Sequence, residues 1–466
     1  MNKSLLLVFQ VTIISYSIMK SYSYANDMII DSVDLSIYKK ETISIIYKVK
    51  FTEDSVPKVT NATPLFYFNQ KGVLSDTTSY KDIGLDRYYS LEVDSNDTTS
   101  IKKMYEFLSN SDLVEHVQLE PEALPTNLNN LSENLSLTTN SATNSSYFDK
   151  QYYLNDTNKN GLFYGINAKY MWDKPGGKGL GVDVVSMECG SYNFQHSDLP
   201  YPSISLGDHS YNPYWGDHDT MSAGIIASLD NGFGTTGIAN QARLGWSYCG
   251  AQEIVYLAQH LKPGSVIQIG VQFQITGHWG SYCQNRCLVP VEYSYAWKDA
   301  IKYSIQKGIH VVLAAGNGNL NLDHVYFDNK FNRNVTDSGA IYVAAITDKG
   351  SRAWFSNYGS RIDSASWGMN VTTTAGGYYN SENLYTESFG GTSSANPILA
   401  GAVASLQGMA YAYGLGALPP KQMREILTDS GRLITGIDET SGIISTQPDL
   451  KQAHDLLLEQ EGIPKL

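Results

Sequence analysis

A serine, a histidine and an asparagine in this sequence have the residue types and surroundings for chemistry on a carbonyl group. Ser393 opens a long apolar helix in GGTSSANPILAGAVASL (390–406), so its hydroxyl lies where free N–H groups and the helix dipole favour a developing negative charge. His218 starts a run of small residues and can accept a proton near neutral pH. Asn317, in AAGNGN (314–319), could present its amide to a reacting carbonyl. Each residue alone also has a structural explanation, as a helix N-cap, a packing residue or a left-handed turn residue.

The segments that must position these residues alternate between apolar strands and helices from Tyr147 onward. We expect strands at 181–187, 242–249, 265–273, 309–316 and 340–347, and helices at 218–229, 294–308 and 394–414. This alternation is typical of a parallel sheet that helices cover on both faces. The residues of interest cluster near the carboxyl ends of such strands, where sites of this architecture form.

The first 25 residues have the features of a secretory signal peptide. Lys3 supplies a short positive region, residues 5–18 are mostly apolar, and Ser23 and Ala25 suit the −3 and −1 positions of a cleavage site. The apolar run is too short and too interrupted for a membrane span, and no later segment reaches about 18 apolar residues. We therefore expect a secreted protein, extracellular or periplasmic, without a membrane anchor.

A small module and a linker precede the main domain. Residues 26–124 contain no Cys or Trp, and we expect an α+β module with strands at 43–51, 87–93 and 114–121 and a helix at 100–110. In residues 125–146, fifteen of 22 are Asn, Ser or Thr and none is aromatic, which predicts a flexible, cleavable linker. Residues 147–466 then form the main domain.

The charge balance limits the partners that this chain can have. Its 46 acidic residues outnumber 33 basic ones, and the net charge of −13 argues against a nucleic acid as partner. The four cysteines allow three disulfide pairings. No histidine flanks Cys283 and Cys287 at zinc-finger spacing, which favours a local closed loop over a metal site.

In their order along the chain, these motifs resemble those of the subtilisin-like serine proteases, the subtilases. GTSSANP resembles the family's GTSMAxP, DHDTMSAGIIA resembles HGTHVAGIIA, and VVLAAGNGN resembles VVxAAGN. VVSMECG with HSDL (184–199) resembles the segment of the catalytic acid, and FSNYGSRIDSAS (355–366) resembles FSNYGxxVDxxAPG. The match covers roughly residues 147–455. It implies a three-layer α/β/α fold with a mostly parallel central sheet.

The resemblance assigns roles to individual residues. It implies that Ser393 is the nucleophile, His218 the general base and Asn317 the oxyanion donor. It also implies that residues 26–124, which end in LVEHVQLEPE, are a propeptide that occupies the cleft until it is cleaved. The residues expected to bind substrate are Gly270, Val271, Gln272, Ala314, Ala315 and Gly316.

The sequence departs from the family pattern at several of these positions. Gly270-Val271-Gln272 replaces Ser-Leu-Gly, Asp219 replaces the Gly after the histidine, and Ser394 replaces the Met after the nucleophile. The usual APG is replaced by Ser-Trp-Gly at 366–368. The position of the family's catalytic Asp holds Glu188.

We expect Glu188 to be the triad acid. Asp183 precedes it by five residues on the same strand, which places it on the opposite face and about 16 Å away. Asp217 and Asp219 directly neighbour His218, and adjacent residues of a helix do not face each other. Glu188 alone ends the first strand. A Ser-His-Glu triad follows, in which the acid accepts the Nδ1–H of the histidine.

The family sheet also implies a disulfide pairing. It places the strands that end at Cys189 and Cys249 side by side, within disulfide reach, so we expect Cys189–Cys249 and Cys283–Cys287.

A calcium loop is a further, weaker possibility. Asp156, Asn158 and Asn160, followed by Gly161, match the first half of a calcium-loop pattern, but position twelve holds Asn167 in place of Glu. A polar turn remains the alternative. We expect no required cofactor and leave a structural calcium open.

These expectations combine into a secreted serine endopeptidase, made as an autoprocessed precursor. It would act as a monomer on protein or peptide substrates through an acyl-enzyme intermediate. The alternative is a pseudoprotease that kept the fold and acts as a secreted binding protein, which the altered acid and substrate strand support.

Overall fold

The structure is a computed structural model that describes most of the 466 residues. The described residues are 42–50, 61–66, 77–126, 147–156, 165–207, 213–275, 283, 287–376, 382–435 and 443–464. The expected signal peptide and residues 127–146 of the expected linker lie outside them.

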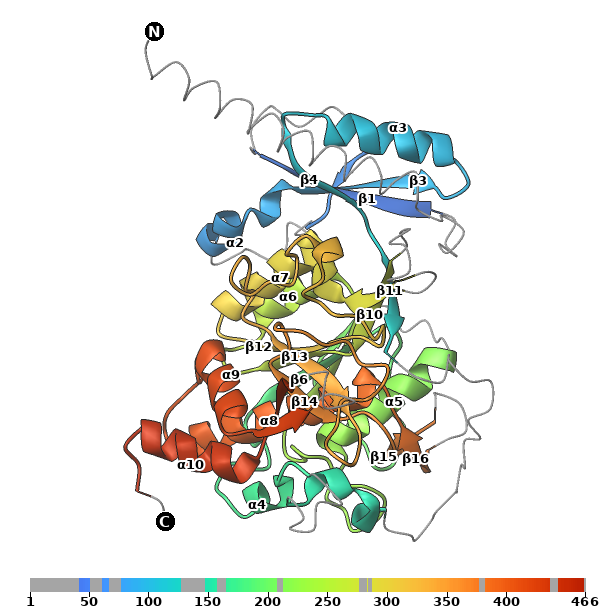
Figure 1. Ribbon diagram of the computed structural model, residues 1–466. Helices are drawn as coiled ribbons and strands as arrows, with labels where there is room; N and C mark the ends of the chain where they lie inside the picture. The colour runs from blue at the N-terminus through green and yellow to red at the C-terminus, as the bar shows by residue number, and fades with distance from the viewer. Residues whose placement is uncertain are drawn as a thin grey trace. The chain divides into compact units, whose positions relative to one another are not determined.

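The described chain divides into two compact units (Figure 1). The smaller unit takes its residues from Met1–Leu65, Arg87–Glu122 and Ile275–Cys287, and the larger unit from Phe66–Asp86, Ala123–Gln274 and Leu288–Leu466. The division differs from a simple boundary at residue 124, because Phe66–Asp86 groups with the larger unit.

The smaller unit is an antiparallel sheet covered by one helix. Its strands are β1 (Thr42–Val49), β2 (Thr63–Pro64), β3 (Tyr88–Asp94) and β4 (Val114–Leu119), in the order β2-β3-β1-β4, with α3 (Thr98–Ser109). Alternate residues of β1 are buried with Ile101, Tyr105 and Leu108 of α3, which recur at helical spacing. Asp97 caps α3 by accepting a hydrogen bond from the Ser100 backbone N–H at 2.9 Å.

The larger unit is built on a nine-stranded, mostly parallel sheet, which confirms the expected fold class. Its order is β17-β18-β14-β13-β12-β9-β6-β8-β7. The strands in that order are Arg432–Thr435, Ile443–Gln447, Ser364–Trp367, Ile341–Ile346, His310–Ala314, Val266–Ile269, Asp183–Glu188, Arg243–Tyr248 and Ser205–Leu206. Every residue of β6, β12 and β13 is buried, so both faces of the sheet are covered.

Helices provide that cover. Helix α8 (Thr392–Ala412) packs on the central strands and against α5 (Pro213–Ala227), while α6 (Ala251–His260) packs against α7 (Tyr295–Gln306). Figure 1 shows α6 and α7 side by side, and α9 (Pro420–Asp429) beside α10 (Leu450–Gln460). The shorter helices are α2 (Thr77–Ile83) and α4 (Ala168–Trp172), and single 3-10 turns occur at Leu85–Arg87, Phe148–Lys150, Tyr152–Leu154, Val291–Tyr293 and Val325–Phe327.

Two boundaries differ from the sequence expectations. Helix α5 begins at Pro213, so His218 lies inside the helix instead of at its start. The expected strand 265–273 is two strands, because the chain leaves the main sheet at Gly270 and continues as β10 (Val271–Ile275). Strand β10 lies between β11 (Cys287–Pro290) and β5 (Glu122–Pro125) in a separate three-stranded sheet, and β15 (Val371–Ala375) pairs with β16 (Leu384–Phe389).

A buried ion-pair network lies between the sheet and α9. Arg361 Nη1 lies 2.6 Å from Asp363 Oδ2, and both side chains are 1% exposed. Arg424 of α9 bonds Asp337 Oδ2 at 2.7 Å. A buried ion pair contributes little net stability compared with apolar residues of the same size. Removing one partner is nevertheless costly, because the other charge then stays buried with fewer partners.

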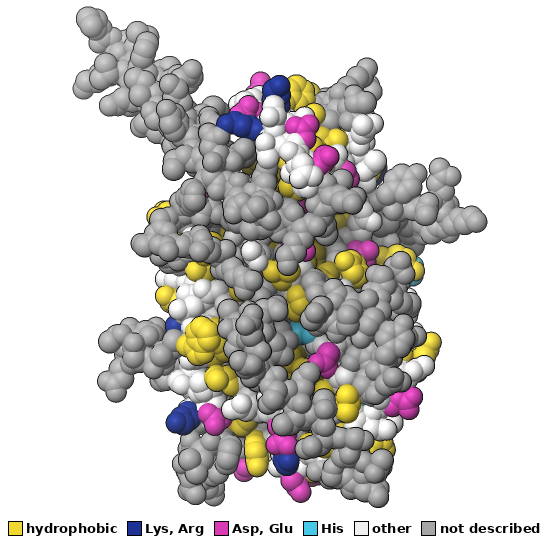
Figure 2. Space-filling view, turned by 90° about the vertical axis from the view of Figure 1, so that its right-hand side faces the viewer, with side chains coloured by type: hydrophobic (Ala, Val, Ile, Leu, Met, Phe, Trp, Pro, Cys, Tyr) yellow, Lys and Arg dark blue, Asp and Glu magenta, His cyan; other side chains and the backbone are white. Residues whose placement is uncertain are grey.

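The described surface is mixed in character. Figure 2 shows acidic and basic side chains interspersed with apolar ones on the described part of that face. Among the described helices, none is both long enough and apolar enough to cross a bilayer.

Candidate active site

The expected nucleophile and base come from the two helices that pack together, α8 and α5. Ser393 is the second residue of α8, directly after a turn at Gly391, whose φ of +93° suits glycine. His218 Nε2 lies 2.7 Å from Ser393 Oγ, and both side chains are buried. Burial lowers the pKa of His218, and the nearby Glu188 charge opposes the shift. A neutral imidazole beside a serine hydroxyl can accept its proton.

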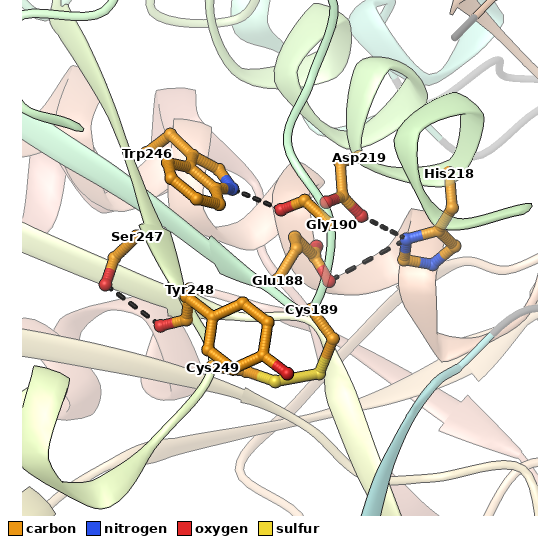
Figure 3. The surroundings of a disulfide bond; sticks show 9 residues. All are labelled: Glu188, Cys189, Gly190, His218, Asp219, Trp246, Ser247, Tyr248 and Cys249. Carbon is orange, nitrogen blue, oxygen red and sulfur yellow. Dashed lines mark hydrogen bonds and ion pairs between the residues drawn. A yellow bond between two sulfur atoms is a disulfide. The ribbon is translucent and has the colours of Figure 1, made fainter. Parts of the chain in front are cut away.

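Two carboxylates lie near the other nitrogen of this imidazole (Figure 3). Asp219 Oδ1 lies 3.1 Å from His218 Nδ1, and Glu188 Oε2 lies 3.7 Å from it. The expectation that adjacency keeps Asp219 away from the imidazole is therefore wrong. Although successive residues of a helix point in different directions, rotation of both side chains brings the Asp219 carboxylate to the imidazole of its neighbour. Asp217 instead accepts a hydrogen bond from the Gly376 backbone N–H.

Both carboxyl groups are costly to ionise where they lie. Burial raises the pKa of Glu188 to about 7, an effect that the His218 charge partly offsets. Burial also raises the pKa of Asp219 well above its usual value, against the effect of the Gly190 backbone N–H, and the Asp217 charge adds to the rise. Two like charges this close in a buried site do not both form readily, so their titrations are coupled.

A buried amide holds Glu188 in place. Gln268 Nε2 donates to Glu188 Oε1 at 2.9 Å and to Asn396 Oδ1 at 2.7 Å, while its Oε1 accepts from Ser186 Oγ at 2.7 Å. Gln268 was not identified from the sequence. The only signal for it was a polar residue inside the apolar strand SVIQIGV.

The glycine at position 270 provides the space for this longer acid. A Cβ atom on Gly270 would lie 2.0 Å from Glu188 Oε1 and 2.5 Å from its carboxyl carbon. No real side chain tolerates such a contact. Two departures from the family pattern, Glu188 and Gly270, are thus sterically linked.

The structure contains both expected disulfides, Cys189–Cys249 and Cys283–Cys287. The first joins the ends of β6 and β8, with Cα atoms 4.9 Å apart, directly after Glu188. Figure 3 shows the Trp246 indole N–H donating to the Gly190 carbonyl beside it. The segment after the acid is therefore fixed by a covalent bond and a hydrogen bond.

The expected oxyanion donor Asn317 faces a segment of the chain's own N-terminal part. Asn317 Nδ2 donates to the Thr126 carbonyl oxygen at 2.6 Å, and its Oδ1 accepts from the Thr392 backbone N–H at 2.9 Å, which fixes the direction of the amide. A Cβ atom on Gly391 would lie 2.1 Å from the same carbonyl oxygen, so this approach requires glycine. Thr126 Oγ1 lies 2.5 Å from Ser393 Oγ.

Two of the expected substrate-binding residues contact the same segment. Gly270 O accepts from the Thr126 backbone N–H at 3.4 Å and from its Oγ1 at 3.0 Å, and Gln272 Nε2 donates to Pro125 O at 3.0 Å. Val271 begins β10, Ala314 ends β12, and Ala315 and Gly316 lead from that strand to Asn317.

A second asparagine, which was not identified from the sequence, braces this turn. Asn357 Nδ2 donates to Ala315 O at 2.7 Å, and its Oδ1 accepts from the Gly318 backbone N–H at 3.1 Å. It belongs to the FSNYGS motif, which was noted only for its resemblance to the family.

The described residues offer limited support for a metal. Asp156 is exposed, Asn158 and Asn160 lie outside the described residues, and Asn167 donates to Asp449 Oδ1 at 2.8 Å. Separately, Glu188, His218 and Asp219 each offer one ligand atom, within 4.8 Å of one another. These are the groups that surround the imidazole of His218.

Comparison with known proteins agrees with this geometry. The sequence profile described as "Subtilase family" matches residues 195–443, which include His218, Asn317 and Ser393 but not Glu188. Alkaline elastase YaB from Bacillus sp. (strain YaB) is 30% identical over 237 residues, 48% of this chain and 54% of that protein. Subtilisin Savinase from Lederbergia lenta is 30% identical over 232 residues, 48% of this chain and 76% of that protein.

The comparison with solved structures supports the same fold. Fervidolysin from Fervidobacterium pennivorans, described as a keratinolytic enzyme related to subtilisin, aligns with a TM-score of 0.56 and 18% identity over 89% of this chain and 61% of that one. The chain spans about half the length of the alkaline elastase that it matches. With the profile covering more than half of its residues, the chain belongs to the subtilase family.

Proposed function

We propose that this protein is a serine endopeptidase that hydrolyses peptide bonds in proteins or peptides. The observation that carries the proposal is a peptide carbonyl, that of Thr126, bonded to the Asn317 amide while Ser393 contacts His218 beside it. This combines a nucleophile, a base and an oxyanion donor around one carbonyl group.

The mechanism follows from these contacts. His218 Nε2 takes the hydroxyl proton as Ser393 Oγ attacks the carbonyl carbon, and Asn317 Nδ2 with the Ser393 backbone N–H stabilises the oxyanion. His218 then donates the proton to the leaving amine. Water, deprotonated by the same imidazole, releases the acyl group from Ser393. The chemistry requires no organic cofactor.

Glu188 is the acid of the proposed triad, and Asp219 is a second acceptor on the same imidazole. The Gln268 amide and the His218 charge both favour the ionised form of Glu188, whereas the Asp217 charge disfavours ionisation of Asp219. The negative charge that the pair gains as the pH rises through about 7 therefore resides mainly on Glu188. It orients His218 and stabilises the imidazolium that forms during the reaction.

The proposal includes secretion and maturation. Residues 1–25 would direct export, residues 26–124 would act as a propeptide, and the mature enzyme would be a monomer. Supporting observations are the apolar leader sequence and the compact α+β unit that precedes the site in the chain.

Labelling with a serine-reactive fluorophosphonate tests the activity directly. The purified protein, matured by its own processing, should be labelled, and Ser393→Ala should be neither labelled nor matured. Ser430→Ala is a matched control, because Ser430 is also buried and its hydroxyl donates to Ile426 O at 2.6 Å. Absence of labelling in a folded, matured protein would overturn the proposal. Normal maturation of Ser393→Ala would show that another protease removes the propeptide.

A further inference from the structure

Residues 123–126 lie in the site in the manner of a substrate. Three backbone groups are held along this segment: Pro125 O by Gln272 Nε2, Thr126 N–H by Gly270 O, and Thr126 O by Asn317 Nδ2. Thr126 is fully buried, and strand β5, which leads into it, pairs with β10. The carbonyl on the oxyanion donor is that of Thr126, so the peptide bond presented for cleavage is the one that follows it.

The side chain of Thr126 is held as specifically as its backbone. Its hydroxyl lies 3.0 Å from Gly270 O and 2.5 Å from Ser393 Oγ. With Ser393 donating to His218, the Thr126 hydroxyl can donate either to Gly270 O or to Ser393 Oγ. A small side chain with a β-hydroxyl group places one oxygen next to both Gly270 O and Ser393 Oγ and donates its single proton to one of them at a time. A large apolar side chain would leave the Gly270 carbonyl without that donor and would meet Ser393.

Gln272 bridges the two backbone contacts on either side of this residue. Its Nε2 bonds the carbonyl before Thr126, and its Oε1 accepts at 2.8 Å from the backbone N–H of Asn317, which holds the carbonyl of Thr126 itself. The carboxamide thus spans the length of Thr126 and is fixed at both ends. It is 3% exposed, so it does not move aside without losing two buried hydrogen bonds.

From these contacts we propose that the enzyme cleaves its own chain after Thr126, and that Gln272 makes the site selective for a small β-hydroxy residue, Thr or Ser, before the scissile bond. This inference rests on the proposed endopeptidase function. In the reaction Ser393 Oγ bonds to the Thr126 carbonyl carbon as the bond to Asn127 breaks. The serine proton passes through His218 to the new amino group of Asn127, a residue outside the described part. Water then hydrolyses the ester to leave a Thr126 carboxylate.

Processing of the full precursor tests the cleavage position. Wild type and Thr126→Ser should both give a mature chain that begins at Asn127, identified by mass spectrometry of the intact protein. Thr126→Phe should slow processing by about tenfold to a hundredfold, the range expected for overpacking a closed site. Thr99→Phe, the same change at an exposed threonine of α3, should process at the wild-type rate.

The matching change in the site tests the role of Gln272. Gln272→Gly should restore processing of Thr126→Phe, and the mature variant should hydrolyse Ala-Leu-Pro-Phe peptides better than Ala-Leu-Pro-Thr peptides, the reverse of wild type. If Thr126→Phe matured at the wild-type rate, or if Gln272→Gly left the peptide preference unchanged, the inference would be overturned. A protein that fluorophosphonate labels but that matures elsewhere refutes only this inference, whereas an unlabelled protein refutes the proposed function.

Discussion

The pairing of Glu188 with Gly270 gives the most direct test of how this site accommodates a longer acid. A Cβ atom on Gly270 would lie 2.0 Å from Glu188 Oε1, whereas ordinary contacts begin near 3.4 Å. In Gly270→Ala the carboxylate must therefore move by about 1.4 Å. The backbone of Gly270 is outside the left-handed region, so alanine introduces no backbone strain, but its Cβ would also lie 2.6 Å from Gln268 Nε2.

The magnitude follows from the size of that displacement. Glu188 Oε2 already lies 3.7 Å from His218 Nδ1, and misplacing a catalytic group by about 1 Å can cost about 10²-fold in rate. We expect Gly270→Ala to lower kcat/KM on a peptide substrate by at least about 10²-fold, or about 2.7 kcal/mol of transition-state stabilisation. Glu188→Asp shortens the acid by one methylene and withdraws the carboxylate from the added Cβ, while the contact with Gln268 Nε2 is common to the single and the double variant. The double variant Gly270→Ala/Glu188→Asp should therefore be more active than Gly270→Ala alone.

Steady-state kinetics and thermal unfolding of the four proteins provide the assay. Gly250→Ala is the control, because the Cβ that it adds would also lie 2.0 Å from a glutamate oxygen, Glu253 Oε2, and the φ of Gly250 is −173°, which any residue adopts. Thermal unfolding separates loss of the fold from loss of the acid. If Gly270→Ala kept wild-type kcat/KM, or if the double variant gained nothing over it, the steric coupling would be refuted.

Four further outcomes follow from the carboxylates and the buried ion pairs. Glu188→Gln should lose up to about 10⁴-fold in kcat, which is the loss typical of a triad whose acid is replaced by its amide. Asp219→Asn should lose less in kcat. The reverse order of the two losses would make Asp219 the acid. Because the pKa of Glu188 is raised to about 7, kcat/KM of wild type should rise as the pH rises through about 7. The pH profile of kcat/KM of Glu188→Gln should lack this rise. Because of the same raised pKa, the folded protein still holds a proton on Glu188 between about pH 4.5 and 7, where the unfolded chain has lost it. The free energy of unfolding of wild type should therefore fall as the pH rises through this range. Urea titration should show a smaller fall for Glu188→Gln. Arg361→Ala should lower the free energy of unfolding by about 1–3 kcal/mol, because Asp363 loses one buried hydrogen bond but keeps its contact with Arg333. A loss below about 0.5 kcal/mol in the same titration would contradict this.

Much of the fold could be predicted because the chain is locally consistent. Apolar strands such as 309–316 and 340–347 correspond to β12 and β13, and the small-residue helix after Gly391 is α8. Ser393, His218 and Asn317 were found because each lies in a motif of contiguous residues. A motif of this kind carries its own turn and helix start, so the local sequence specifies most of the geometry.

The residues that the sequence did not reveal act through contacts between distant segments. Thr126 contacts Gly270 and Ser393, which are 144 and 267 residues away in the sequence. The local sequence Pro-Thr-Asn at 125–127 contains no signal for these contacts. The role of Asp219 depended on side-chain rotation inside a helix whose start at Pro213 was not foreseen. Gly270 was visible as a departure from the family pattern, but its relation to Glu188 is a matter of packing that only the three-dimensional structure provides.

The segment that lies in the site has one more consequence, which concerns reaction order. Thr126 belongs to the same chain as Ser393, so it reaches the nucleophile at an effective concentration that the intervening chain sets, commonly in the millimolar range for short flexible connections. Dilution does not change that value, and a maturing precursor should follow first-order kinetics with a half-life independent of protein concentration. Once the chain is cut, the released segment can return only as a separate molecule. Its hold on the site then weakens with every dilution, and external peptides can compete for the place that it leaves.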